Sequence, residues 1–230
     1  MTNEVTSTTF NYQIIRAKRK TVAIHVHNGA VEVRAPLRVS KRWINEFVVS
    51  KSNWVLKKLK EKPHPGIVIS DGTVIHYLGE PITISILTAL KKSIVFENHQ
   101  LILKVKDFNQ THIKTLFVEW LKMQAANYMV PRATTLAQQL NVNHKLQGFR
   151  FRITRRTWGH CSGKGIIQFN PLIMLAPPDV IDYLIAHEVC HLQHMNHSPR
   201  YWALLSSICN HYKSSQKLLK ALEPCLRLDE

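Results

Sequence analysis

The sequence predicts an α+β fold in two regions. Residues 1–108 are expected to form antiparallel hairpins with one helix, and residues 109–230 a small, mostly helical domain. Three observations predict this: apolar residues alternate around turn dipeptides in the first half, a long helical pattern begins near residue 111, and a later helix carries two histidines one turn apart. With 230 residues, the chain can bury one sizeable core or two small ones.

Turns between runs of alternating apolar residues predict hairpins in the first half. Asn28-Gly29 is favoured in type I′ turns because both central positions need positive φ, and Asp71-Gly72 follows the same logic. A third pair of runs is joined by a longer polar turn. The paired runs are 21–27 with 31–35, 67–70 with 73–78, and 93–96 with 101–105. The first half is therefore expected to be mostly antiparallel strand.

Apolar residues at helical spacing predict two helices in the first 140 residues. Ser40 can cap a helix that ends before Pro63. A longer helix is expected from Thr111 towards Leu140. Pro131 should kink or interrupt it, because proline supplies no amide hydrogen and clashes with the preceding turn.

Short strands and two more helices are expected after residue 148. The strands are predicted at 149–153, which has one basic face, and at 166–169. A helix from Asp179 to about His194 follows. Ser198-Pro199 then marks the N-cap and first position of a final helix.

Composition predicts a cytoplasmic protein with reduced cysteines. No stretch approaches the roughly 20 apolar residues of a membrane span, and the polar start of the chain lacks the apolar core of a secretory signal. The four cysteines include no CxxC pair, which argues against a disulfide framework or a thiolate zinc knuckle. No membrane partner is expected.

The formal net charge of +16 favours anionic partners such as nucleic acid or nucleotides, although a basic surface also keeps proteins soluble. No acidic residue occurs between Glu119 and Asp179, so this stretch should produce a local positive field. Its cations are Lys122, Arg132, Lys145, Arg150, Arg152, Arg155, Arg156 and Lys164. The candidates for binding a substrate or an anion are Arg152, Arg155, Arg156 and Arg200.

His187 and His191 are candidate metal ligands. They are four residues apart within the sequence HEVCH, so on a helix their side chains project from one face one turn apart. The alternative is an amphipathic helix whose histidines merely face solvent. His197 weighs against that alternative because it extends the pattern to HExxHxxHxxH, which has the spacing of three-histidine zinc sites.

His194 competes with His197 for the third ligand position. On a continued helix His194 would lie about 10 Å along the axis from His187. Zinc–imidazole bonds are only about 2.0 to 2.1 Å long, so those two rings could hardly share one ion. The chain must turn before the new helix at Ser198, and a turn can bring His197 back over the first two rings. We therefore predict His187, His191 and His197 as the ligands.

A Zn²⁺ ion on three neutral imidazoles keeps a fourth tetrahedral position open for water, which distinguishes catalytic from structural zinc sites. Glu188 adjoins a ligand on the helix and can accept a proton from that water. A structural zinc site would not require this glutamate. The pattern therefore predicts a zinc hydrolase with Glu188 as the general base.

Several segments of the chain together match one known pattern. They are 31–36, the helix 40–60 with Trp54, 156–162, 175–183, 187–191 and 194–202. In these segments the sequence resembles the YgjP-like metallopeptidase family, a relative of the SprT-like and WLM zinc peptidases, over nearly its whole length. The resemblance implies a small zincin-like catalytic domain over residues 109–230, with His187, His191 and His197 as ligands and Glu188 as the catalytic residue.

One loop departs from the family pattern. The family usually has Arg-Trp-Gly-Ser-Cys, whereas this chain has Thr157 in place of the arginine and His160 in place of the serine. The loop is expected either to form a tight glycine turn with Trp158 in the core or to contact substrate. Candidates for stabilising an oxyanion are Arg200, Tyr201 and His211.

Three functions are compatible with these patterns. The first is hydrolysis of a peptide or protein that pairs in extended form with an edge strand at 165–169. The second is hydrolysis of a nucleoside triphosphate such as UTP to release pyrophosphate. In this case the arginine-rich stretch 149–156 would hold the phosphate oxygens. The sequence has no glycine-rich loop of the kind that cradles phosphates, which counts against this function. The third is a DNA-associated protease, as the resemblance to SprT-like proteins suggests, although no helix-turn-helix or zinc-finger pattern is present.

Overall fold

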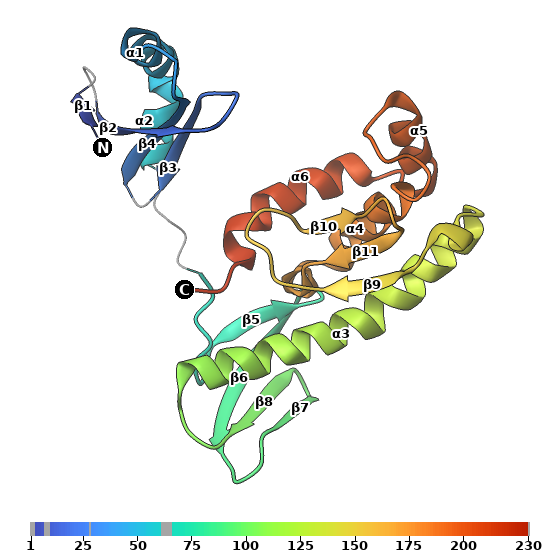
Figure 1. The fold of residues 1–230 in the computed structure, drawn as a ribbon. Coiled ribbons are helices and arrows are strands. Elements are labelled where there is room, and N and C mark those ends of the chain that lie inside the picture. Colours follow the sequence, from blue (N-terminus) through green and yellow to red (C-terminus); the bar gives the residue numbers. More distant parts are fainter. Residues whose placement is uncertain (1–2, 7–9, 28, 61–65, 230) are drawn as a thin grey trace. The chain divides into compact units, whose positions relative to one another are not determined.

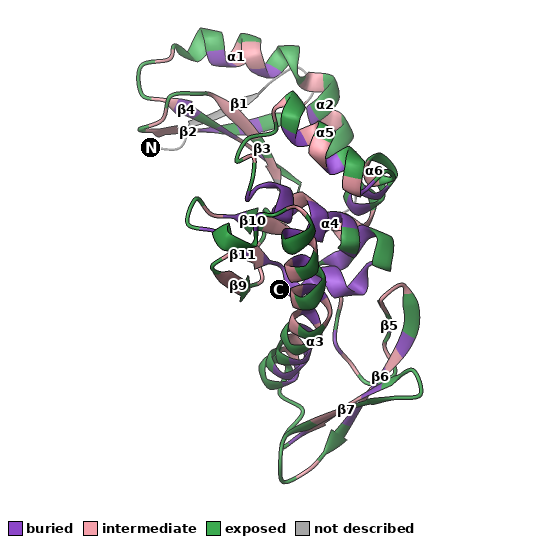
Figure 2. Cartoon of the chain, turned by 90° about the vertical axis from the view of Figure 1, so that its right-hand side faces the viewer, coloured by how far each residue is buried: buried purple, intermediate pink, exposed green. Residues whose placement is uncertain are grey.

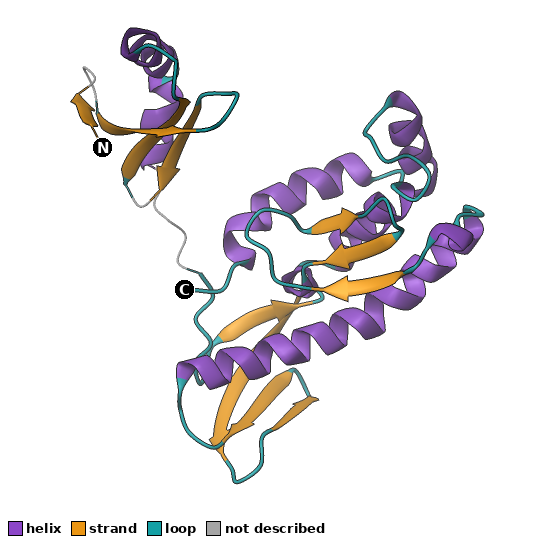
Figure 3. Ribbon diagram, viewed as in Figure 1, coloured by secondary structure: helices purple, strands orange, loops and turns teal. Residues whose placement is uncertain are grey.

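The structure, a computed structural model, describes residues 3–6, 10–27, 29–60 and 66–229. It divides into two compact units, residues 1–64 and 65–230, each with a core of its own. Both units combine helices with small sheets (Figure 3), which confirms the predicted α+β class. The division differs from the expected boundary after residue 108, because the strands of residues 74–105 share their core with the helices that follow.

The first unit is a four-stranded sheet with two helices (Figure 1). The order is β1-β2-β4-β3, and the central pair β2–β4 is parallel. Its elements are β1 (Asn3–Thr6), β2 (Asn11–Ala17), β3 (Ala23–His27), β4 (Ala30–Pro36), α1 (Lys41–Ser50) and α2 (Ser52–Lys60). The β3–β4 hairpin is confirmed, although Asn28 of its turn lies outside the described residues. Ser40 caps α1, as predicted, by accepting a hydrogen bond from the Trp43 backbone N–H at 3.2 Å.

A second four-stranded sheet opens the larger unit, in the order β5-β6-β8-β7. Its strands are β5 (Val74–Tyr77), β6 (Glu80–Thr88), β7 (Ser93–Glu97) and β8 (Gln100–Val105). The β7–β8 hairpin is confirmed. The hairpin predicted around Asp71-Gly72 is wrong, because β5 pairs instead with β6. Leu78 and Gly79 between them have φ of 52° and 83°, the positive values that a tight hairpin turn needs.

The long helix α3 (Gln110–Gln139) runs through Pro131 without interruption (Figure 1), so the expected break is wrong. A proline inside a helix removes one backbone hydrogen bond and costs about 3 kcal/mol. Buried residues continue on both sides of it, including Ala125, Met129 and Ala133. Burial of this face against the core offsets the lost hydrogen bond. None of the described helices is long and apolar enough to cross a membrane.

A third, three-stranded sheet leads into the helix that carries the histidines. Its strands are β9 (Gly148–Phe151), β10 (Gly159–Cys161) and β11 (Ile166–Phe169), in the order β10-β11-β9. β10 is antiparallel to β11, and β9 is parallel to it. The expected edge strand at 165–169 is therefore wrong, since β11 is central. The glycine turn expected in the Trp158 loop is instead the edge strand β10.

Three helices complete the second unit: α4 (Pro178–Cys190), α5 (Pro199–Ile208) and α6 (Tyr212–Leu222). Figure 2 shows α4 as mostly buried, which makes it the central helix of this unit. The predicted helix to His194 ends earlier, and residues 191–193 form turns. The helix expected at Ser198 is α5, but α6 follows it.

Gly165 is expected to be essential for stability. Its φ is +76°, and a Cβ at this position would lie 1.8 Å from the Lys145 carbonyl oxygen. Gly165→Ala should therefore lower the free energy of unfolding by more than about 2 kcal/mol, measured by denaturant unfolding. The control is Gly163→Ala in the same loop, where a Cβ meets nothing within 4 Å. Equal unfolding midpoints for the two variants would contradict the expectation.

Candidate metal centre

Helix α4 and the turn after it bring three histidines together. His187 lies in the last turn of α4, His191 is its C-cap, and His197 lies just before α5. Each offers a ring nitrogen, and these three atoms all lie within 4.8 Å of one another. The Nε2 atoms of His187 and His197 are 3.2 Å apart. Nitrogens this close can share one ion with bonds of about 2.0 to 2.1 Å.

His194 contributes its backbone to this cluster. Its carbonyl oxygen lies 2.9 Å from Nδ1 of His191. A proton on Nδ1 donated to that carbonyl leaves Nε2 of His191 with a free lone pair, and such an outer hydrogen bond is a common way to orient a metal-binding imidazole. Among the described residues, the side chain of His194 is not part of the group that could hold an ion.

Tyr201 from α5 packs against all three histidine rings. Its ring lies 4.7 Å from His191, with the planes 27° apart, and 4.7 Å from His197. Its hydroxyl donates to the His187 backbone carbonyl at 3.1 Å, and the side chain is fully buried. Burial raises the pKa of Tyr201. Tyr201 therefore supports the rings from the core, and its hydroxyl is not available as an oxyanion donor.

The surroundings keep the rings of His187 and His191 neutral. Burial, together with the neighbouring rings of His191 and His197, lowers the pKa of His187 to about 4. Burial also lowers the pKa of His191. Nδ1 of His187 is buried with no hydrogen-bond partner among the described residues. Neutral imidazoles with available lone pairs are what a divalent transition metal requires, so this donor set fits one.

Glu188 lies beside the cluster, packed against β10. Its side chain is only 3% exposed, and a Cβ added to Gly159 would lie 2.3 Å from its Oε1 atom. The Cys161 backbone N–H donates a hydrogen bond to the carboxylate, but burial dominates and raises the pKa of Glu188 to about 8. A dication on the histidines would lower this pKa again, because a nearby positive charge favours the carboxylate.

A comparison with known protein families identifies the family of this chain. The model of the YgjP-like metallopeptidase domain matches residues 20–222 of the chain. This chain belongs to the YgjP-like metallopeptidase family. A solved structure, the metallopeptidase zymogen of Pyrococcus abyssi abylysin, is 19% identical with a TM-score of 0.36 and covers 44% of this chain and 100% of its own, a likeness too low to carry an argument. No curated protein matches.

Membership makes this YgjP-like protein a metallopeptidase, an enzyme that works with a divalent metal ion. His187, His191 and His197 are placed to bind that ion. The three histidines predicted from the sequence converge, and the predicted base Glu188 lies beside them. The sequence did not predict the supporting contacts of Tyr201, the His194 carbonyl and Gly159. For the contact between Gly159 and Glu188, the sequence offered a single indication, the glycine between Trp158 and His160.

The loop that departs from the family pattern is held by Asn170, which sequence reasoning also missed. This side chain is 3% exposed and donates to the Thr154 carbonyl at 3.0 Å, while its backbone N–H donates to the Trp158 carbonyl at 2.7 Å. These bonds hold the start of β10 next to β11. Burial raises the pKa of the Cys161 thiol to about 11, so this neighbour of Glu188 stays protonated.

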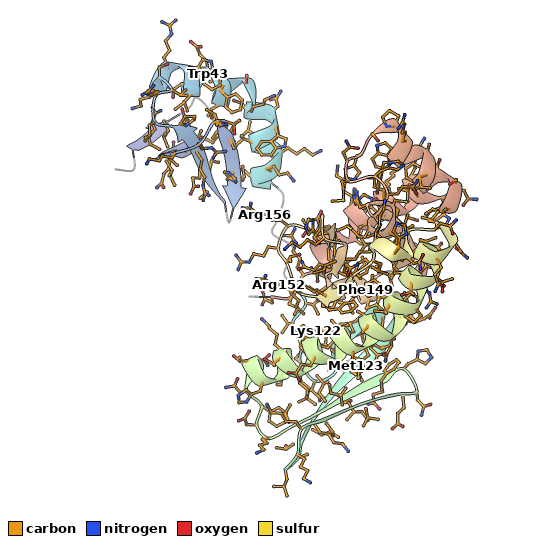
Figure 4. All side chains as sticks on the ribbon, turned by 45° about the vertical axis from the view of Figure 1, so that its right-hand side comes forward. Trp43, Lys122, Met123, Phe149, Arg152 and Arg156 are labelled. Carbon is orange, nitrogen blue, oxygen red and sulfur yellow. The ribbon has the colours of Figure 1, made fainter. Side chains whose placement is uncertain are left out.

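The four arginines predicted to bind substrate are exposed in this YgjP-like domain. Arg152 follows β9, Arg155 and Arg156 lie in the loop before β10, and Arg200 lies in the first turn of α5. In Figure 4, Arg152 lies near Phe149 and Arg156 lies farther along the loop. Arg152, Arg156 and Arg200 form no side-chain hydrogen bond or ion pair with the described residues of the metal centre. The structure therefore does not bring them into the histidine cluster.

Proposed function

We propose that this YgjP-like protein is a zinc peptidase in which His187, His191 and His197 hold Zn²⁺ and Glu188 is the general base. The observation that carries the proposal is the convergence of three histidine nitrogens within 4.8 Å, next to a buried carboxylate. Three nitrogen donors with no carboxylate among them suit zinc better than magnesium or calcium, which prefer oxygen ligands. The open fourth position then belongs to water or substrate.

When bound, Zn²⁺ supplies a Lewis acid that polarises a carbonyl oxygen and makes water easier to deprotonate. Glu188 performs the proton transfers. It accepts the proton of the attacking water and delivers it to the departing amine, a role that requires the carboxylate to lie within hydrogen-bond reach of the reacting atoms. The backbone of β10 orients Glu188, since Gly159 leaves room for its carboxylate and the Cys161 N–H holds it.

The edge strand β10 is the best place for a peptide substrate. The Trp158 carbonyl bonds to the Asn170 N–H and the Ser162 N–H to the Ile166 carbonyl, so the backbone groups of Gly159 and Cys161 point away from β11. The Cys161 N–H already holds Glu188, which leaves the Gly159 backbone for a substrate. An extended peptide that added to this edge would lie next to Glu188. This edge replaces the expected one at 165–169.

Replacing Glu188 by Gln tests the proposal. The amide keeps the size of the side chain but cannot take up the proton, so we expect hydrolysis of an unfolded protein such as casein to fall by about 10²- to 10⁴-fold. Zinc content should stay near one ion per chain, measured by elemental analysis. Nucleoside triphosphates and DNA-bound protein, offered in the same assay, separate the other two functions. Full activity of the variant, or hydrolysis of nucleotides alone, would reject the peptidase.

A further inference from the structure

The first unit has a charge distribution that the peptidase does not explain. Residues 10–60 contain twelve Lys and Arg residues against two Glu. Both glutamates already pair with arginines of the same unit, Glu32 with Arg34 and Glu46 with Arg42. The unit therefore presents a large excess of positive charge, which attracts polyanions.

A groove of about 540 Å³ lies within this unit. One wall comes from the loop between β2 and β3, and the other from residues 36–43, at the start of α1. Lining residues are Lys20, Thr21, Val22, Pro36, Val39, Ser40 and Trp43. Arg16 supports the second wall from behind, because its guanidinium donates to the carbonyls of Pro36, at 2.8 Å, and Val39. The groove is thus part of the folded unit, held by a cation that is not itself on its lining.

Trp43 gives the groove an aromatic surface. Its side chain is 48% exposed, although a tryptophan gains by burial. Phe47, one turn later on α1, stacks on it with ring centroids 5.5 Å apart and planes 8° apart. The stack holds the indole in one orientation at the groove, on α1 (Figure 4). A flat planar ligand can extend such a stack.

Cations adjoin the groove lining on both walls. Lys20 lines the groove, and Lys18 and Arg19 precede it in the same loop. On the second wall, Lys41 follows the lining residue Ser40 in the first turn of α1, which has no acidic residue. Cations at a helix N-terminus oppose the helix dipole, whereas a bound anion would relieve this repulsion. Two independent features, the charge of the first turn and the exposed indole, therefore favour a ligand with phosphates and planar rings.

We propose that the first unit binds single-stranded nucleic acid, with a base stacked on Trp43 and phosphates held by Lys20 and Lys41. An acidic polypeptide would meet the cations but supply no ring for the indole. A duplex would supply phosphates while its bases stay stacked on each other. Single strands combine charge with free base faces, the combination that basic grooves with aromatic platforms recognise.

Binding of the full-length protein to fluorescein-labelled eight-nucleotide oligothymidylate and oligouridylate, followed by anisotropy, tests this. Trp43→Ala should weaken binding by about tenfold or more. Trp54→Ala is the matched control, since Trp54 is similarly exposed at 45% but does not line the groove; it should change binding less than twofold. Far-UV circular dichroism and the denaturant unfolding curve of Trp43→Ala should match those of the wild type, which checks that the first unit, with its separate core, remains folded.

A second pair of variants tests the charge separately. Replacing Lys20 and Lys41 by Gln should weaken binding and reduce the slope of log affinity against log salt by about 1.4. Replacing Lys57 and Lys60 of α2 by Gln removes the same charge away from the groove lining and should have a smaller effect on both. Equal effects of the two pairs, equal affinity for a duplex, or tight binding of polyglutamate that depends on Trp43 would each overturn the proposal.

Discussion

Gly159→Ala is expected to abolish most peptide hydrolysis while leaving zinc bound. An added Cβ would lie 2.3 Å from Oε1 of Glu188 and 2.7 Å from its Cγ and Cδ. Because these atoms belong to a flexible side chain, the carboxylate can move aside, so we expect the fold to survive. Displacing a catalytic group by about 1 Å can cost about 100-fold in rate. We therefore expect hydrolysis to fall at least 100-fold.

Gly163→Ala is the control for this variant. Gly163 lies in the turn that follows β10, and a Cβ there meets nothing within 4 Å. Both variants should contain about one zinc per chain and unfold at similar denaturant concentrations. Wild-type activity in Gly159→Ala would show that the contact between β10 and Glu188 does not position the base.

His197→Ala should lose both zinc and activity, whereas His194→Ala should keep both. Only the ring of His197 joins the cluster, while His194 contributes its backbone carbonyl, which alanine also has. Losing an outer partner of a zinc ligand weakens metal binding by about 10- to 100-fold. Loss of a ligand itself should therefore weaken it by more than about 100-fold, measured by competition with a chromogenic chelator.

The two histidine variants form a matched pair, because both remove one imidazole from the same turn. If His194→Ala lost zinc as severely as His197→Ala, the third ligand would have been assigned to the wrong residue. If neither lost it, the site would need a ligand outside this turn.

The convergence of the three histidines could be predicted because their geometry is local. His187 and His191 are four positions apart in the sequence, and this spacing places both side chains on the same face of a helix. The start of α5 at Ser198-Pro199 required a turn just before it, and that turn explains the position of His197. Glu188 adjoins a ligand in the sequence, so its place followed from the same helix.

The remaining features depend on contacts between distant segments, which periodicity does not reveal. Alternating apolar residues predicted β7 and β8 but not which core they would join, so the boundary was expected near residue 108 rather than 64. The strand β10 was missed because it spans only Gly159–Cys161, too short for a pattern. Its contact with Glu188 links residues about 30 positions apart.

X-ray absorption at the zinc edge of the zinc-loaded wild-type protein tests the central claim most directly. We predict three imidazole nitrogens at about 2.0 to 2.1 Å and one further oxygen ligand, the pattern of an open catalytic site. A sulfur ligand near 2.3 Å, as a cysteine would give, or a shell with only two imidazoles, would contradict the assignment of His187, His191 and His197.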